Sequence, residues 1–156
     1  MTPGINAAKK AGVTHRIHEY DHDPSNEHYG DEAVQKTGAD PQQVFKTLVV
    51  TVDDKQLVVA VVPVAGMLSM KHIARAAGGK KAAMADPNDV QRSTGYVLGG
   101  VSPLGQKRRL KTFIDSSAQA FNTIFVSAGR RGLEIELSPA DLATLTAAQF
   151  APLQQG

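Results

Sequence analysis

Two valine-rich segments, residues 45–52 and 56–62, constrain the fold more than any other part of the chain. They read FKTLVVTV and QLVVAVV, and the β-branched residues that dominate them favour strands. Only Asp53, Asp54 and Lys55 separate the two segments, which is a link of hairpin length. The sequence therefore predicts a β-hairpin here.

The other elements follow in irregular order. Capping residues and glycines predict helices over residues 2–11, 31–37, 69–77 and 86–93, a short helical turn at 40–41, and a final helix from 138 onward. Further strands are expected over residues 13–21, 96–98, 111–114, 123–127 and 133–137. Because regular β-α-β alternation is absent, we expect an α+β fold, and the length favours one domain over residues 1–156.

Composition excludes several classes of protein. The chain has 42% hydrophobic and 21% charged residues, as globular proteins do, and no cysteine. Disulfides, thiolate zinc sites and a cysteine nucleophile are therefore excluded. The longest apolar stretch, residues 57–70, is interrupted by Pro63 and Gly66 and is too short to span a bilayer. With no recognisable secretory signal, we expect a cytoplasmic protein that does not associate with membranes.

Charge is distributed unevenly along the sequence. Residues 1–70 contain six Lys/Arg and nine Asp/Glu, residues 71–131 contain eleven and three, and residues 132–156 contain three acids and no base. A basic middle between acidic flanks favours a polyanion as partner, most commonly a nucleic acid. A solvated surface with clustered lysines is the alternative.

A glycine-rich loop, residues 99–105, is the first candidate site. Gly99 and Gly100 allow unusual backbone angles and close approach of a ligand, and exposed N–H groups can bind a carbonyl oxygen or phosphate. The basic run at residues 106–111 follows directly. The spacing does not match a P-loop, and a plain tight turn is the simpler interpretation of the glycines alone.

Lys46 and the N-terminal histidines are the other candidates. Lys46 begins a strand that is otherwise apolar, so its ammonium either reaches the surface or faces a cleft. His18 and His22 are four residues apart, which permits a metal pair on one face of a strand. A polar, half-exposed segment explains these histidines equally well, and we expect no metal and no cofactor.

Short motifs extend over nearly the whole chain. The longest is QRSTGYVLGGVSPLGQK at residues 91–107. The others are TP at 2–3, YDHDP at 20–24, GDE at 30–32, FKTL at 45–48, MADP at 84–87, VS at 126–127 and GRRGL at 129–133. Together, and in this order, they resemble the YbaK proteins of the prolyl-tRNA synthetase editing-domain superfamily.

The resemblance implies a mixed, barrel-like β-sheet flanked by helices, and a deacylase of Cys-tRNA(Pro). Such enzymes act in trans, after prolyl-tRNA synthetase has charged proline tRNA with cysteine. A pocket that admits proline rejects a residue of similar size by only a few kcal/mol, so a second enzyme is needed. The implied partners are proline tRNA and prolyl-tRNA synthetase, and the substrate's own thiol is the implied nucleophile.

The resemblance also implies the site. Lys46 is the central functional residue, with Tyr20 and Gly99 beside it as catalytic residues. The implied substrate-binding residues are Phe45, Thr47, Gly100, Ser102, Pro103, Ser127, Gly129 and Glu134. Backbone N–H groups around residues 99–102 are the candidates for stabilising an oxyanion. The basic residues Lys107, Arg108, Arg109, Arg130 and Arg131 are expected to contact tRNA phosphates.

Two positions depart from the family pattern, and other functions stay open. Glu134 stands where relatives often have Asp, and Ala128 stands where the second glycine of a Ser-Gly-Gly is usual. Alternative functions are a deacylase for tRNA mischarged with alanine or serine, a tRNA- or nucleotide-binding module without activity, and a metal protein that uses the histidines. The sequence leaves the oligomeric state open.

Overall fold

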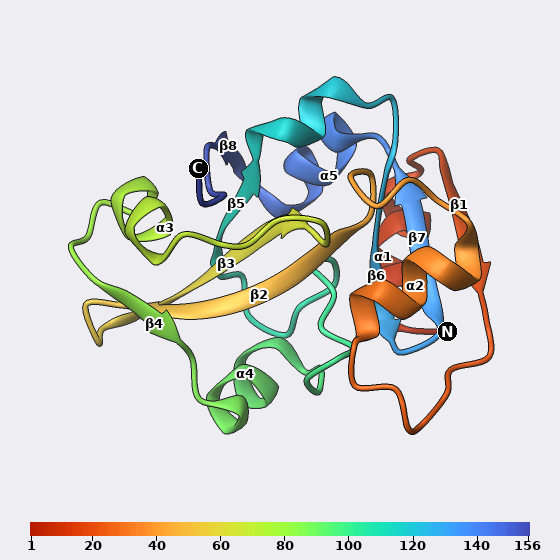
Figure 1. Ribbon diagram of the computed structural model, residues 1–156, viewed down its shortest axis with the longest axis horizontal. Helices are drawn as coiled ribbons and strands as arrows, with labels where there is room; N and C mark the ends of the chain where they lie inside the picture. The colour runs from red at the N-terminus through yellow and green to blue at the C-terminus, as the bar shows by residue number, and fades with distance from the viewer.

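The strands form two separate sheets, seen in the right and left halves of Figure 1. The computed structural model describes residues 1–156. The three-stranded sheet has the order β1 (His15–Glu19), β7 (Leu133–Leu137) and β6 (Ile124–Arg130). The five-stranded sheet has the order β4 (Ala82–Met84), β2 (Phe45–Val52), β3 (Gln56–Pro63), β5 (Lys111–Asp115) and β8 (Gln149–Ala151).

The predicted hairpin of β2 and β3 is confirmed and forms the middle of the larger sheet. The two strands pair antiparallel, with Val49 opposite Val59. Asp53 and Asp54 form the turn with φ of 54° and 55°, a left-handed conformation that Asp tolerates better than most residues. Beyond the hairpin, β3 pairs in parallel with β5, so the sheet is mixed.

The larger sheet is buried on both faces because alternate residues of β3 contribute to different cores. Val58, Ala60 and Val62 pack with Ile73 of α3 (Met70–Ala76) and with Leu153. The residues between them, Val59 and Val61, pack against the smaller sheet and the remaining helices. This arrangement follows from the two-residue period of a strand, and it explains why β3 is apolar at almost every position.

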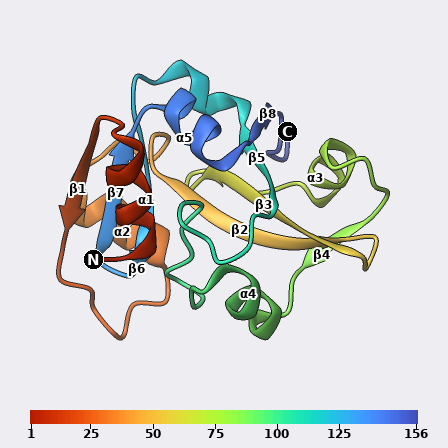
Figure 2. The ribbon, with the colours of Figure 1, turned by 180° about the vertical axis from the view of Figure 1, so that it is seen from behind.

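The helices cover the sheets as the capping residues predict. Helix α1 (Pro3–Ala11) and helix α2 (Tyr29–Thr37) lie on opposite faces of the three-stranded sheet, as the two views in Figures 1 and 2 show. The side chains of Thr2, Ser69, Asp86 and Ser138 cap α1, α3, α4 (Pro87–Thr94) and α5 (Pro139–Thr146). None of the helices has both the length and the hydrophobicity that a membrane-spanning segment requires.

The α+β class is confirmed, but the sheets do not close into a barrel. The only pairing between them is one isolated parallel bridge from Val44 to Phe125, just before β2 begins. A closed barrel would need a continuous ladder at this seam. The side chains of the two sheets instead pack face to face across one core.

Three short elements were not expected, and one expected strand is absent. The unexpected elements are β4, β8 and a 3₁₀ helix, η1 (Ser116–Ala120). Residues 96–98 form no strand, because their backbone groups are used locally: Tyr96 N–H donates to Thr94 Oγ1, and Val97 C=O accepts from Gly100 N–H. Strand β1 is shorter than the expected 13–21, and α2 begins at Tyr29 instead of residue 31.

Candidate functional site

One cavity of about 220 Å³ lies where the two sheets meet. Its walls come from α2, the first residues of β2, the glycine loop and the paired strands β6 and β7. The lining includes eight residues singled out from the sequence, namely Tyr20, Phe45, Lys46, Thr47, Gly99, Ser127, Arg131 and Glu134, and eight others, namely Tyr29, Gly30, Ala33, Val44, Leu48, Val64, Leu98 and Val101. Segments far apart in the chain therefore converge on one small, largely apolar space.

Lys46 places an ammonium group in this cavity. The side chain is half-buried, and Nζ donates a hydrogen bond to the Gly66 carbonyl oxygen at 3.1 Å. Burial lowers the pKa of Lys46 below its ordinary value, and the Asp31 carboxylate offsets part of this effect. No carboxylate lies within ion-pair distance of Nζ. The cation is therefore available to a ligand.

Glu134 faces the same cavity from β7 as a buried carboxyl group. Only 7% of the residue is exposed, and burial raises the pKa of Glu134 to about 8. At neutral pH the group is therefore mainly a neutral acid, which can donate a hydrogen bond as well as accept one. Its strand partners are His18 on β1 and Ser127 on β6.

The hydroxyl groups of Tyr20 and Thr47 add to the polar lining near these residues. Burial, together with the Glu134 and Glu32 carboxylates, raises the pKa of Tyr20 to about 12, so its phenol keeps its proton. The Oγ1 of Thr47 is buried and has no hydrogen-bond partner in the protein. Because such an unpaired group is costly, this hydroxyl is a candidate to bind substrate.

Gly99 lies against an arginine–tyrosine pair at the rim of the cavity. Its φ is +87°, and a Cβ there would be 2.6 Å from Arg131 Nε and 2.8 Å from Tyr29 Cε2. Gly100 N–H is used by Val97, but the N–H groups of Gly99 and Val101 donate to no group of the protein. The glycine thus permits both the turn and the close approach of the Arg131 side chain.

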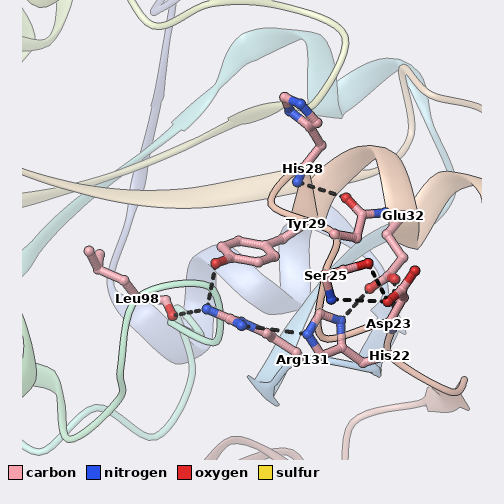
Figure 3. A network of polar contacts seen from close by, with 9 residues as sticks. His22, Asp23, Ser25, His28, Tyr29, Glu32, Leu98 and Arg131 are labelled. Carbon is pink, nitrogen blue, oxygen red and sulfur yellow. Dashed lines mark hydrogen bonds and ion pairs between the residues drawn. The ribbon is translucent and has the colours of Figure 1, made fainter.

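A polar network holds Arg131 in place (Figure 3). Its NH2 donates to the Tyr29 hydroxyl at 2.5 Å, and its NH1 lies 3.5 Å from His22 Nε2. The other ring nitrogen of His22, Nδ1, donates to the buried Glu32 carboxylate at 2.5 Å. The hydrogen bond from His22 is the main cause that lowers the pKa of Glu32. His22 therefore links the buried Glu32 carboxylate to Arg131.

Four residues expected to bind substrate do not line the cavity, namely Gly100, Ser102, Pro103 and Gly129. Ser102 is fully buried behind the loop, where its Oγ accepts from Leu104 N–H. Gly100 packs against the Arg130 backbone, since a Cβ there would be 2.9 Å from Arg130 Cα. The structure therefore gives Ser102 and Gly100 contacts that shape the loop.

The five basic residues expected to contact tRNA fall into two groups. Arg131 lines the cavity, and with Arg130 it also borders an outer groove beside His22. Arg108 and Arg109 line a different groove together with Lys55, Arg92 and Lys111, and Lys107 precedes them as an exposed residue. The two groups are the two basic runs of the sequence, and the fold places them at different grooves.

The sequence interpretation overlooked Tyr29, Glu32 and His22 as parts of one network. His22 lies in the YDHDP motif, Glu32 lies in the GDE motif and Tyr29 directly precedes the latter, but only the fold brings these segments to Arg131. The structure also changes the interpretation of His18 and His22 as a metal pair. His18 bonds to Glu136 and His22 bonds to Glu32, and His22 lies beyond the end of β1. No group of three or more metal-ligating residues is present.

Comparison with known proteins identifies the family. Residues 26–145 match the family described as aminoacyl-tRNA editing domain. The chain belongs to the aminoacyl-tRNA editing domain family. The expected class of enzyme, an aminoacyl-tRNA deacylase, is confirmed by this match and by a relative from Enterococcus faecalis. That relative, EbsC, is named as a candidate Cys-tRNA(Pro)/Cys-tRNA(Cys) deacylase.

The editing-domain relatives are similar over most of their length. EbsC is 40% identical over 136 residues, which cover 86% of this chain and 83% of EbsC. YwhH of Bacillus subtilis, which has no described function, is 30% identical over 112 residues, or 72% of this chain and 71% of YwhH. The crystal structure of a candidate trans-editing enzyme for prolyl-tRNA synthetase superposes with a TM-score of 0.86, at 26% identity, covering 99% of this chain and 96% of that one.

Proposed function

We propose that this editing domain hydrolyses the ester of Cys-tRNA(Pro) in trans, with the substrate thiol as nucleophile. The observation that carries the proposal is the makeup of the cavity: a cation, a neutral carboxyl group and free N–H groups, but no activated protein nucleophile. A hydroxyl nucleophile needs an adjacent base. Thr47 Oγ1 has no partner, and Ser127 Oγ accepts only from Gly129 N–H.

The size of the cavity favours a small amino acid. A volume of about 220 Å³ is below the common range for ligand pockets, ~300–1,000 Å³. The apolar walls formed by Phe45, Val64 and Leu48 fit a cysteine side chain better than a charged one. Discrimination between cysteine and alanine then depends on the thiol itself, because a size difference of one group changes affinity only modestly.

The proposed reaction needs the protein mainly to position and stabilise. The thiol sulfur attacks the carbonyl carbon of its own ester, the bond from that carbon to the ribose oxygen breaks, and the thiol proton ends on the released ribose hydroxyl. Water then opens the cyclic thioester and releases cysteine. Intramolecular attack gains an effective concentration of roughly 10⁵ M or more when the geometry is held.

The residues of the cavity have complementary roles in this proposal. The Lys46 ammonium stabilises the thiolate form of the substrate and binds its terminal phosphate or adenosine. The N–H groups of Gly99 and Val101, which donate to no group of the protein, stabilise the oxyanion. The neutral carboxyl group of Glu134 donates a hydrogen bond to the amino acid, and the unpaired hydroxyl of Thr47 gains a partner when substrate is bound.

The proposed substrate also determines where and with whom the protein acts. Proline tRNA is present in the cytoplasm together with its synthetase, and the similar trans-editing protein is named for prolyl-tRNA synthetase. Phosphate contacts from Arg130, Arg131 and the 107–109 group add affinity with little selectivity. Selection of proline tRNA therefore depends on association with prolyl-tRNA synthetase in this proposal.

Hydrolysis of labelled aminoacyl-tRNA tests the proposal. Cys-tRNA(Pro), Ala-tRNA(Pro) and Ser-tRNA(Pro) are incubated with the wild-type protein, with Lys46→Ala and with Lys10→Ala, an exposed lysine of α1 outside the cavity. We expect rapid loss of cysteine alone, abolished by Lys46→Ala and unchanged in Lys10→Ala.

The other outcomes distinguish the remaining functions. Loss of alanine or serine instead of cysteine would keep the enzyme class and change the specificity. Binding of tRNA without hydrolysis of any ester would contradict the proposed reaction and favour a binding module. Full activity of both Lys46→Ala and Lys46→Arg would remove Lys46 from the mechanism.

A further inference from the structure

The Lys46 ammonium is held by a backbone carbonyl instead of a carboxylate. Nζ donates to Gly66 O, which is its only hydrogen-bond acceptor in the protein. A lysine side chain has a flexible stem, so its position is determined by the groups that hold its end. The loop that carries Gly66, residues 64–69 between β3 and α3, therefore determines where this cation lies.

The C-terminal tail, residues 152–156, fixes that loop. Gln155 N–H donates to Met67 O at 2.9 Å, and Ser69 N–H donates to Leu153 O at 2.7 Å. The side chain of Gln154 lies directly against Gly66, where an added Cβ would be 2.0 Å from Gln154 Oε1. The glycine is thus required by the close approach of a side chain from the other end of the chain.

A buried aspartate in turn anchors Gln154. Asp115, at the end of β5, is 3% exposed. Its Oδ2 accepts from Gln154 Nε2 at 2.8 Å, and its Oδ1 accepts from Leu153 N–H at 2.8 Å. Burial alone would raise the pKa of Asp115, but hydrogen bonds from Ser117, Leu153 and Gln154 outweigh it and lower the pKa. The carboxylate is therefore a fixed, charged acceptor for the tail.

We propose that Gln154 is a positioning residue for Lys46, acting through the Gly66 carbonyl. The path runs from the Asp115 carboxylate to the Gln154 amide, and from the Gln154 side chain to Gly66 and the Lys46 ammonium. Residues 152–156 lie outside the range that matches the editing-domain family, 26–145. The inference rests on the proposed function only in that Lys46 serves the deacylation.

The structure provides a matched pair of glutamines for the test. Gln154→Ala removes the amide that bonds to Asp115 and the contact with Gly66. Gln154→Met keeps the length and the contact, and removes only the hydrogen bond. Gln155→Ala is the control, because Gln155 is exposed, its backbone N–H supplies the 2.9 Å bond to the loop, and its side chain adds only a long contact of 3.5 Å from Nε2 to Leu68 O.

Two measurements are made on each variant, after circular dichroism has established that it is folded. The first is kcat and KM for deacylation of Cys-tRNA(Pro). The second needs no substrate activity: the rate at which an amine-acylating reagent labels Lys46 is followed by mass spectrometry across pH, which gives the apparent pKa of that lysine.

We expect kcat to fall about tenfold in Gln154→Ala, with KM changed much less, because a cation displaced by a fraction of an ångström affects the reaction more than binding. The apparent pKa of Lys46 should rise toward its ordinary value as the ammonium becomes better hydrated. Gln154→Met should lower kcat and raise the apparent pKa of Lys46 as well, but by smaller amounts. Gln155→Ala should match the wild type in both quantities.

The proposal is overturned if folded Gln154→Ala and Gln154→Met keep both the wild-type kcat and the wild-type labelling profile. If Gln154→Ala does not fold, the same two measurements on Gln154→Met test the proposal, and wild-type values of both would overturn it. If the wild type hydrolyses no aminoacyl-tRNA but the labelling of Lys46 still shifts in the Gln154 variants, the positioning role stands and only the proposed deacylation fails.

Discussion

The Arg131 guanidinium lies over the ring of Tyr29, 3.9 Å from the ring centroid, and also donates to the hydroxyl of the same residue. One side chain comes from the turn between β6 and β7 and the other begins α2, so the contact joins two walls of the cavity (Figure 3). Arg131 NH2 also lies 3.5 Å from Leu98 O in the glycine loop. The pair therefore fixes three segments around one opening.

This contact predicts that substituting Arg131 lowers kcat/KM more than the same substitution of its sequence neighbour Arg130. Arg131→Lys keeps the charge but loses the planar group that stacks on Tyr29 and spans its several acceptors, so we expect kcat/KM for aminoacyl-tRNA to fall about tenfold. Arg130→Lys should have little effect, because Arg130 is exposed and pairs only with Glu19. Equal kcat/KM in the two variants would contradict a specific role for the stacking of Arg131 on Tyr29.

A second prediction concerns Gly99, with Gly95 as its control. Both residues have similar positive φ, 87° and 83°, but the nearest contact for a Cβ at Gly95 is 3.7 Å away, on Lys107. Gly95→Ala should therefore lower the free energy of unfolding by roughly 1–2 kcal/mol and leave activity intact. Gly99→Ala should reduce activity as well, since it displaces Arg131. Urea unfolding and deacylation assays of both variants separate the two effects.

The buried carboxyl group of Glu134 predicts a pH-dependent stability. Its pKa is about 8 in the folded protein, against an ordinary 4.5. Between these values the unfolded chain binds fewer protons at this group, so stability falls as pH rises. Glu134→Gln removes this dependence. The free energy of unfolding of the variant should gain on the wild type by up to about 1.4 kcal/mol per pH unit in this interval.

Urea titrations of the wild type and Glu134→Gln at pH 5, 6, 7 and 8 check this prediction. A constant difference between the two proteins over that range would mean that Glu134 is already ionised in the folded state. The proposed hydrogen-bond donation by a neutral Glu134 would then be wrong.

Salt dependence reveals which basic residues contact the tRNA. If phosphates are bound, the logarithm of kcat/KM should fall linearly with the logarithm of salt concentration. Replacing Arg108 and Arg109 by Gln should lower the slope by roughly one for each lost contact. An unchanged slope in this double variant would place the tRNA at the other group, Arg130 and Arg131.

Local signals in the sequence predicted much of the fold. The β2–β3 hairpin follows from valine-rich runs joined by two aspartates. Four helices, α1, α3, α4 and α5, begin at side chains that cap them, whereas α2 has no side-chain cap. Strands β4 and β8 have three residues each, and they exist because β2 and β5 offer free edges to pair with. Nothing within three residues encodes such a neighbour, so these strands were not predictable.

The residues of the site also divide into those that local sequence signals predict and those that depend on distant segments. Lys46 and Gly99 were predictable from the residues, because a charge is unusual in an apolar strand and paired glycines mark a special loop, whereas Thr47 was implied only by the family resemblance. The contacts of Arg131 and Gln154 depend on segments about 100 and 90 residues away, which only the fold brings together. Ser102 and Pro103, which share a motif with Gly99, lie outside the cavity because the loop leaves the cavity wall after Val101 and Ser102 is fully buried.

Strand β3 separates the two cores by the thickness of one backbone, and this has a consequence for cooperativity. Its alternate residues anchor the core beside α3 and the tail, and the core beneath the cavity. Neither half of the molecule can lose its packing without exposing the opposite face of the same strand. We therefore expect both halves to melt in a single transition, and the amides of β3 to be among the last to exchange with solvent.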